Sequence, residues 1–175
     1  MKLLLALLAA SVVCAAPAWA DTISEQDVAK IKADIVAMYA AFEKGDPSLV
    51  MANTHESALA LFGGKEAMAQ VTQETLQQMA QLRIKFLSSE TGTPTQTYPA
   101  GEEEVCFVPR IALMEAQGQK VKVTGFMVAI RHVGGHDWKY LDGAPISKDP
   151  ALLRMLLPKL TSDVELPPSN TEVLM

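Results

Sequence analysis

Residues 121–141 read VKVTGFMVAIRHVGGHDWKYL, and this stretch decides the fold. Residues 121–133 form an apolar-rich run that is long enough to bend across a whole β-sheet. Gly134-Gly135 is a two-residue hairpin signal, and residues 136–141 are the expected return strand. The second half of the chain is therefore expected to build an antiparallel meander around one long, curved strand.

The turn at Gly134-Gly135 also fixes which residues lie opposite one another. It pairs Ala129 with Tyr140 and Arg131 with Trp138. Successive side chains of a strand point to opposite faces, so two sets result. One face carries Met127, Ala129, Arg131, Trp138, Tyr140 and Asp142, and the other carries Phe126, Val128, Ile130, His132, Asp137, Lys139 and Leu141. The sequence leaves open which face lies inside.

Upstream of this stretch, four shorter segments have the alternating or apolar pattern of strands. They cover residues 84–89, 95–98, 103–108 and 111–115. The last stretch of the chain, residues 166–170, contains a Pro-Pro pair and is expected to be a loose tail.

The first half of the chain is expected to be mainly helical. Ser24 and Asp27 form an N-terminal cap, and apolar residues at helical spacing follow until Gly45. Pro47 starts a short second helix, which ends near Asn53. Residues 58–62 are expected to form a short strand. Residues 65–82 are expected to form a helix that turns four apolar side chains inward, namely Met68, Val71, Met79 and Leu82.

A last helix is expected after Asp149-Pro150, ended by Pro158 and packed down by its leucines. The order of these elements predicts an α+β domain in which helices cover one face of a bent antiparallel sheet. We expect a single domain over residues 21–160 and a C-terminal tail over residues 161–175.

The first twenty residues have the features of a cleavable export signal. Lys2 precedes an apolar run over residues 3–13, and Ala18-Trp19-Ala20 is a small-x-small cleavage site. The run is shorter than the roughly 20 apolar residues that a membrane-spanning helix needs, so no stable membrane insertion is expected. The sequence predicts cleavage after Ala20 and a periplasmic or secreted protein.

Composition narrows the possible partners and cofactors. Without Lys2 the chain keeps 14 basic and 20 acidic side chains, the opposite of the balance that nucleic-acid binding needs. Cys106 would be the sole cysteine after cleavage, and its apolar surroundings indicate a buried side chain, with a reactive thiol or an intermolecular bridge as alternatives. No nucleotide-binding or hydrolase motif occurs, and no close set of metal ligands. We expect no nucleic-acid partner, no metal and no cofactor.

Three short motifs, in this order, suggest a family. They are Tyr39-Ala40-Ala41-Phe42 leading to Gly45-Asp46, then Gly63-Gly64-Lys65-Glu66-Ala67-Met68, and then the hairpin of residues 134–140. The chain resembles the nuclear transport factor 2-like superfamily (the cystatin-like α+β cone), which includes ketosteroid isomerase-like and polyketide cyclase-like proteins. The resemblance covers most of residues 23–143. It implies helices packed on a curved sheet that encloses a cone-shaped cavity, with any ligand bound inside.

If the face with Tyr140 lines that cavity, a set of ligand-binding residues follows. The set is Tyr39, His55, Met127, Arg131, Trp138, Tyr140 and Asp142. These side chains would suit a small apolar or amphipathic molecule that is bound without catalysis, or a protein partner. An alternative is a cofactor-free isomerase, cyclase or dehydratase, with Asp142 as base and Tyr39 as the phenol that stabilises an enolate oxygen. Against it, no carboxylate pair stands at matching positions.

A third alternative is a dimerisation module. The outer face of such sheets often pairs, and a homodimer could form through four apolar residues of the hairpin, Phe126, Val128, Ile130 and Leu141.

Overall fold

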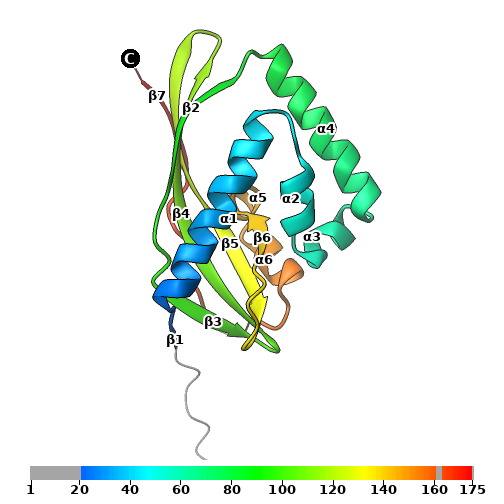
Figure 1. Cartoon of the computed structure of the whole chain (residues 1–175), viewed down its shortest axis with the longest axis vertical. Coiled ribbons are helices and arrows are strands. Elements are labelled where there is room, and N and C mark those ends of the chain that lie inside the picture. The colour runs from blue at the N-terminus through cyan, green and yellow to red at the C-terminus, as the bar shows by residue number, and fades with distance from the viewer. Residues whose placement is uncertain (1–20, 161–162, 175) are drawn as a thin grey trace, which may run out of the picture.

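The computed structural model describes residues 21–160 and 163–174, and they form an α+β fold with one open antiparallel sheet (Figure 1). The predicted export signal lies outside the described residues. The strands are β1 (Asp21–Thr22), β2 (Lys85–Thr91), β3 (Gln96–Ala100), β4 (Glu103–Ala116), β5 (Gln119–His132), β6 (Lys139–Asp142) and β7 (Asn170–Leu174). The helices are α1 (Glu25–Glu43), α2 (Ser48–Asn53), α3 (Glu56–Leu61), α4 (Lys65–Gln81), α5 (Gly143–Lys148) and α6 (Ala151–Leu156).

Two 14-residue strands, β4 and β5, run the whole height of the sheet and pair along their full length. Gln117 and Gly118 turn the chain between them with φ angles of 53° and 81°, the conformation of a tight hairpin turn. In the view of Figure 1, the lower half of β4 pairs with β3 and its upper half pairs with β2. The β5 strand likewise pairs with β6 in its lower half and with β7 in its upper half. The long curved strand is confirmed. The two segments predicted over residues 103–108 and 111–115 are one strand, which continues through Pro109.

The β5–β6 register agrees with the prediction, but the turn is longer than predicted. Ala129 pairs with Tyr140, and the ladder ends at Ile130 and Lys139. The prediction that residues 136–138 belong to the return strand was therefore wrong. Trp138 lies outside the ladder but is still buried in the layer with Tyr140, where it is 1% exposed.

Alternation along β4, β5 and β6 produces two apolar layers, one on each face of the lower sheet. One layer packs against α1 and contains Cys106, Val108, Met127, Ala129, Trp138 and Tyr140. The other packs against α5, α6 and the loop that follows, and contains Val105, Phe107, Phe126, Val128, Ile130 and Leu141. Helices therefore cover both faces of the sheet, and the prediction that they cover one was wrong. The surface predicted to form a homodimer, Phe126, Val128, Ile130 and Leu141, is buried within the chain.

The N-terminal helix begins and packs as its sequence pattern predicts. The Ser24 hydroxyl accepts a hydrogen bond from the Asp27 amide at 3.1 Å, which caps α1. Ile31, Ile35 and Met38 follow on one helix face and are buried against the sheet. Gly45, with a φ of 81°, allows the turn into α2.

Two helices differ from the predictions. Residues 58–62 do not form a strand, because α3 spans most of them and His55 caps its first turn. A short apolar run does not distinguish a strand from a helix segment. The α4 helix has its predicted bounds but buries only Thr72, and it stands away from the sheet (Figure 1). Val71 is 41% exposed but lines a pocket beside α4, whereas Leu82 is 49% exposed, so the prediction that Leu82 turns inward was wrong.

The C-terminal region is more ordered in structure than the sequence pattern indicates. The predicted last helix is confirmed as α6, with Leu153 and Leu156 buried, and α5 precedes it. Residues 166–169 of the predicted loose stretch belong to no helix or strand, but within the predicted C-terminal tail residues 170–174 form β7 and pair with β5 along the upper edge of the sheet. Among the described residues, no helix is long and apolar enough to cross a lipid bilayer.

Candidate functional site

An apolar pocket of about 320 Å3 lies where α1 to α4 meet the β5–β6 hairpin and the C-terminal helices. Four of the predicted ligand-binding residues line it: Tyr39, Met127, Tyr140 and Asp142. The other walls come from side chains that the sequence analysis did not assign to a site, including Met38, Phe42, Val50, Ala58, Met68, Thr72, Leu141 and Ile146. Such a pocket is at the small end of the range for small-molecule sites. The spacing of Met38, Tyr39 and Phe42 on one helix was a signal for its α1 wall.

Tyr39 contributes the main polar group within the apolar walls. Its hydroxyl donates to the sulfur of Met127 at 3.3 Å, and the Arg110 guanidinium carbon lies 3.4 Å from the centre of its ring. Burial raises the pKa of Tyr39 to about 12, although the Arg110 cation acts in the opposite direction. The phenol is therefore a proton-bearing donor at neutral pH. A thioether is a weak acceptor, so a ligand oxygen would be a better partner for this hydroxyl.

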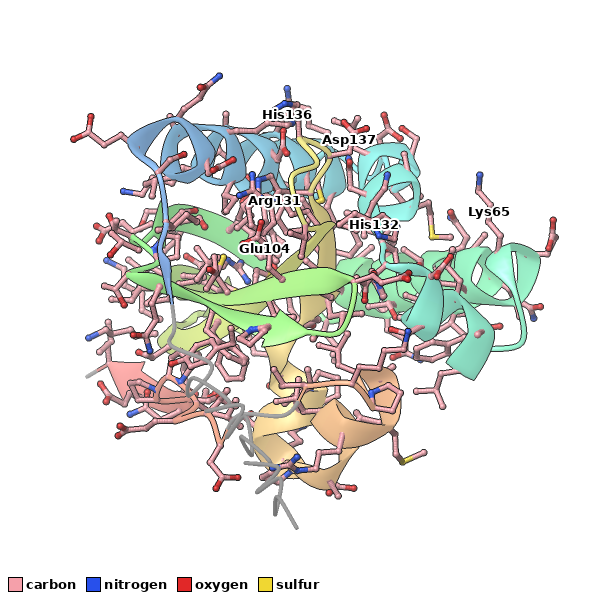
Figure 2. The ribbon with its side chains drawn as sticks, turned by 90° about the horizontal axis from the view of Figure 1, so that it is seen from below. Lys65, Glu104, Arg131, His132, His136 and Asp137 are labelled. Atoms are coloured by element: carbon pink, nitrogen blue, oxygen red, sulfur yellow. The ribbon has the colours of Figure 1, made fainter. Side chains whose placement is uncertain are left out.

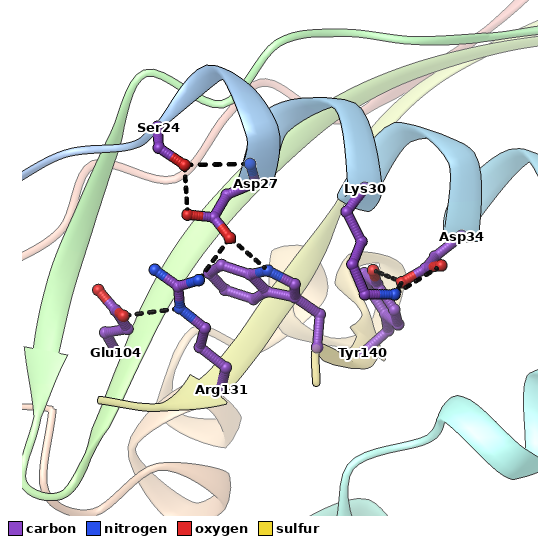
Figure 3. A network of polar contacts seen from close by, with 8 residues as sticks. Ser24, Asp27, Lys30, Asp34, Glu104, Arg131 and Tyr140 are labelled. Carbon is purple, nitrogen blue, oxygen red and sulfur yellow. Dashed lines mark hydrogen bonds and ion pairs between the residues drawn. The ribbon is translucent and has the colours of Figure 1, made fainter. Parts of the chain in front are cut away.

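Tyr140 lies beside Tyr39 in the pocket lining, but its hydroxyl is already engaged. It donates to the Asp34 carboxylate at 2.8 Å, and Lys30 pairs with the same carboxylate at 2.9 Å (Figure 3). Burial, and then the Asp34 charge, raise the pKa of Tyr140 well above its ordinary value. Tyr140 therefore presents its ring to the pocket and stabilises the position of α1 on the sheet.

Asp142 is placed at the edge of the pocket rather than in a dry interior. Its side chain is exposed and accepts a hydrogen bond from the Ala144 amide at 3.0 Å, which caps α5. Among the described residues that line the pocket, it is the one carboxylate. Asp142 and Tyr39 line the same pocket, but the Asp142 carboxylate is exposed. The two residues therefore do not provide the buried carboxylate and phenol that the enzymatic alternative needs.

Arg131 and Trp138 lie outside this pocket, in an ion-pair network beneath the start of α1. The Arg131 guanidinium binds Asp27 and, at 2.7 Å, Glu104, and it stacks on Trp138 at 4.4 Å (Figure 3). Figure 2 shows Arg131 and Glu104 side by side, with the β5–β6 loop next to them. The Trp138 indole also donates to Asp27, at 3.3 Å. Arg131 and Trp138 therefore contact each other, but neither lines the pocket that contains Tyr39.

The network holds its groups in their charged forms. Burial would raise the pKa of Asp27, but the bonds from Ser24, Arg131 and Trp138 outweigh it and lower that pKa. Burial would likewise lower the pKa of Arg131, yet Glu104 and Asp27 raise it. This network is structural, since every member is satisfied by another member.

His55 lines a different pocket, on the side of α3 that faces the start of β4. Its Nδ1 lies 2.8 Å from the Ser57 hydroxyl, and its Nε2 lies 3.1 Å from Glu103 Oε1. Neither Ser57 nor Glu103 stands in a recognisable motif, so their contacts with His55 were not predicted.

Cys106 is fully buried between α1 and the sheet, as the favoured interpretation predicts. Burial raises the pKa of its thiol to about 12, so neither alternative, a reactive thiol or an intermolecular bridge, agrees with this position. Within residues 21–160 and 163–174, no three His, Cys, Asp or Glu side chains lie close enough together to hold a metal ion.

Comparison with models of protein families, with curated proteins and with solved structures finds no match to the chain.

Proposed function

We propose that this protein binds a small apolar or amphipathic molecule, without catalysis, in the pocket between α1, α4 and the β5–β6 hairpin. The observation that carries the proposal is the environment of Tyr39. A mainly apolar pocket contains two tyrosines, and the Tyr140 hydroxyl is bonded to Asp34, whereas the hydrogen bond of the Tyr39 hydroxyl is to the sulfur of Met127. A ligand with an apolar body and a single oxygen acceptor complements both features. Such a ligand would exchange a weak hydrogen bond for a strong one.

The runner-up is a cofactor-free isomerase, cyclase or dehydratase in the same pocket. Such an enzyme needs a base held within hydrogen-bond reach of its substrate, in surroundings that suit proton transfer. Asp142 is exposed and bonds the Ala144 amide, which favours ligand binding over this alternative.

The proposal includes a setting and a fold family. We propose that residues 1–20 are removed on export to the periplasm or the medium and that the domain is nuclear transport factor 2-like. Support comes from the export-signal pattern and from the order of helices followed by an antiparallel meander. The alternative is that a protein partner or a second copy of the chain binds an exposed surface. The hairpin face that α6 covers is not available for this contact.

Two fluorescent probes test the ligand class. Prodan is neutral and apolar and carries one carbonyl, whereas N-phenyl-1-naphthylamine is apolar and lacks a carbonyl. The expected result is saturable binding of both. Tyr39→Phe should weaken prodan about 5-fold, the effect of one hydrogen bond of ~1 kcal/mol, and leave the second probe unchanged.

Matched variants on α4 locate the binding site. Thr75 lines the pocket, whereas Gln77 is exposed on the same helix and does not line it. Thr75→Trp should fill the pocket and abolish probe binding, while Gln77→Trp should bind as the parent protein does.

Native mass spectrometry of residues 21–175 purified from the periplasm would reveal a retained ligand. Failure of both probes to bind, or equal binding by the two tryptophan variants, would refute this site.

A further inference from the structure

A second pocket, of about 480 Å3, contains a hydrogen-bonded Ser-His-Glu series that the apolar pocket does not use. Ser57, His55 and Glu103 all line it. Ser57 and His55 lie at the start of α3, and Glu103 is the first residue of β4. Residues that are 48 positions apart in the sequence are thus joined through one imidazole ring.

The contacts determine where the imidazole carries its proton. An ionised carboxylate only accepts, so the Glu103 contact at 3.1 Å places the proton on Nε2. Nδ1 then carries the one lone pair of the ring, which the Ser57 amide uses as a cap contact at 3.3 Å and shares with the Ser57 hydroxyl. The Ser57 hydroxyl, 2.8 Å from the same nitrogen, must also donate to it. The imidazole is therefore arranged as a base toward the Ser57 hydroxyl.

The ring is held rigidly in this orientation. His55 is 6% exposed, and its own amide donates to the Tyr140 carbonyl at 3.0 Å. Capping of α3 requires only Nδ1, so the Glu103 contact is additional to the cap. A nucleophile, a base and a carboxylate that orients the base form the arrangement used for nucleophilic catalysis on several unrelated folds.

We propose that this pocket hydrolyses carboxylic esters, with Ser57 as nucleophile, His55 as general base and Glu103 as positioning residue. Ser57 Oγ bonds to the ester carbonyl carbon while its proton passes to Nδ1 of His55. The carbon–oxygen bond to the alcohol then breaks, and the proton on Nδ1 leaves with the alcohol. Water, deprotonated by the same nitrogen, adds to the acyl-serine. The acid is released and the Ser57 proton is restored.

The walls of the pocket indicate the substrate. Ala60, Leu156 and Leu157 form an apolar side that suits a short acyl chain. Lys159 lines the same pocket together with the carboxylates of Glu56 and Glu102, and the proposal assigns to Lys159 the negative charge that develops on the carbonyl oxygen. The proposed substrate is thus an ester with a small apolar acyl group.

A fluorophosphonate probe tests the serine directly, because it labels activated serines and leaves ordinary hydroxyls unmodified. Intact-mass and peptide analysis should find one adduct, on Ser57. Ser57→Ala should remove the adduct and lower p-nitrophenyl butyrate hydrolysis at least 100-fold. Ser48→Ala, on an exposed serine of α2, is the control and should keep both. No adduct, or an adduct on another residue, would overturn the proposal.

Glu103→Gln separates positioning from structure. A glutamine oxygen still accepts from Nε2, so the melting temperature should stay within 2 °C of the parent protein's, while the labelling rate falls at least 10-fold. A labelling rate equal to that of the parent protein would show that Glu103 is only structural and would overturn its role. Ser57→Cys provides a second test of the nucleophile: its thiol should react with iodoacetamide faster than the exposed thiol of Ser48→Cys. Reaction of Ser57→Cys no faster than that of Ser48→Cys would contradict activation by His55.

Discussion

Replacing Arg131 with methionine is expected to destabilise the fold and to reverse its pH dependence. The substitution keeps an apolar stem of similar length over Trp138 but removes the cation between Asp27 and Glu104. The three charged side chains are 13%, 15% and 18% exposed, so water replaces the lost guanidinium poorly. Two carboxylates would then face each other without a counter-ion.

The size of the loss follows from this burial. Exposed ion pairs contribute ~1 kcal/mol or less, whereas removal of one partner from a buried pair costs about 3–5 kcal/mol. A network that is 13–18% exposed lies nearer the second case, and Arg131 has two carboxylate partners. We therefore expect about 3 kcal/mol less free energy of unfolding at pH 7. For a chain of this size, this corresponds to a melting temperature about 6–12 °C lower.

The pH dependence distinguishes charge from packing. In the parent protein the pKa of Asp27 lies below its ordinary value of 3.8, so its contribution is complete above that pH and is lost as the pH falls below it. In Arg131→Met, the Asp27 carboxylate loses the cation that lowers its pKa and faces the Glu104 charge, so the pKa of Asp27 should rise. That variant should gain stability as the pH falls from 7 toward 4. The difference between the two proteins is therefore largest at neutral pH.

Urea unfolding between pH 4 and pH 7 measures both effects. Arg154→Met is a matched control, because Arg154 is 60% exposed and pairs with the fully exposed Asp163, so stability should hardly change. The triple variant Asp27→Asn, Glu104→Gln, Arg131→Met should recover part of the loss, since no unpaired charge remains. A loss below about 1 kcal/mol, or a loss that is equal at pH 4 and pH 7, would refute the electrostatic explanation.

Three further predictions concern packing. Gly143→Ala should destabilise by about 1–3 kcal/mol in thermal unfolding, because a Cβ there would lie 2.3 Å from the Phe126 carbonyl oxygen. Gly125→Ala should cost less, because a Cβ there would make only an ordinary contact, 4.0 Å from the Ser169 hydroxyl. An equal loss at both glycines would contradict this reading of the close approach. Cys106, with a pKa of about 12 and no exposed surface, should react with iodoacetamide only at the rate of unfolding, and fast labelling under native conditions would disprove that. Deletion of residues 170–175 should lower the melting temperature by a few degrees at most, because all five residues of β7 are exposed. Complete unfolding of the deletion variant would show that this edge strand is essential.

The alternation of side chains along the strands predicted the central hairpin and the two sets of residues on its faces. A register shift of one residue would have moved every apolar side chain to the other face. It could not tell which face is inner, since both are apolar and both are covered. Strand β7 was missed for the opposite reason. All five residues of its sequence NTEVL are exposed, and they show no alternation of apolar and polar side chains.

The site was predicted in part, and the errors share one cause. Residues of one sheet face were grouped as one site, but that face is long enough to meet different partners along its height. Met127, Tyr140 and Asp142 reach the apolar pocket, whereas Arg131 lies under the start of α1. His55 was included in the set, but Glu103, which binds it, was predicted only as the first residue of a strand over residues 103–108. Pairings across distant strands leave little trace in a single sequence.

The two-sided sheet also sets an order in which the chain can fold. The β4–β5 hairpin closes locally through Gln117 and Gly118, but one of its faces is covered by α1 and the other by α5 and α6. Such non-local contacts are slow to form. During synthesis the layer on α1 is complete once Tyr140 has emerged, whereas the other layer also needs residues 151–160. Until then Phe126, Val128 and Leu141 present an uncovered apolar face, which makes the nascent chain a substrate for chaperones and its truncation products prone to aggregate.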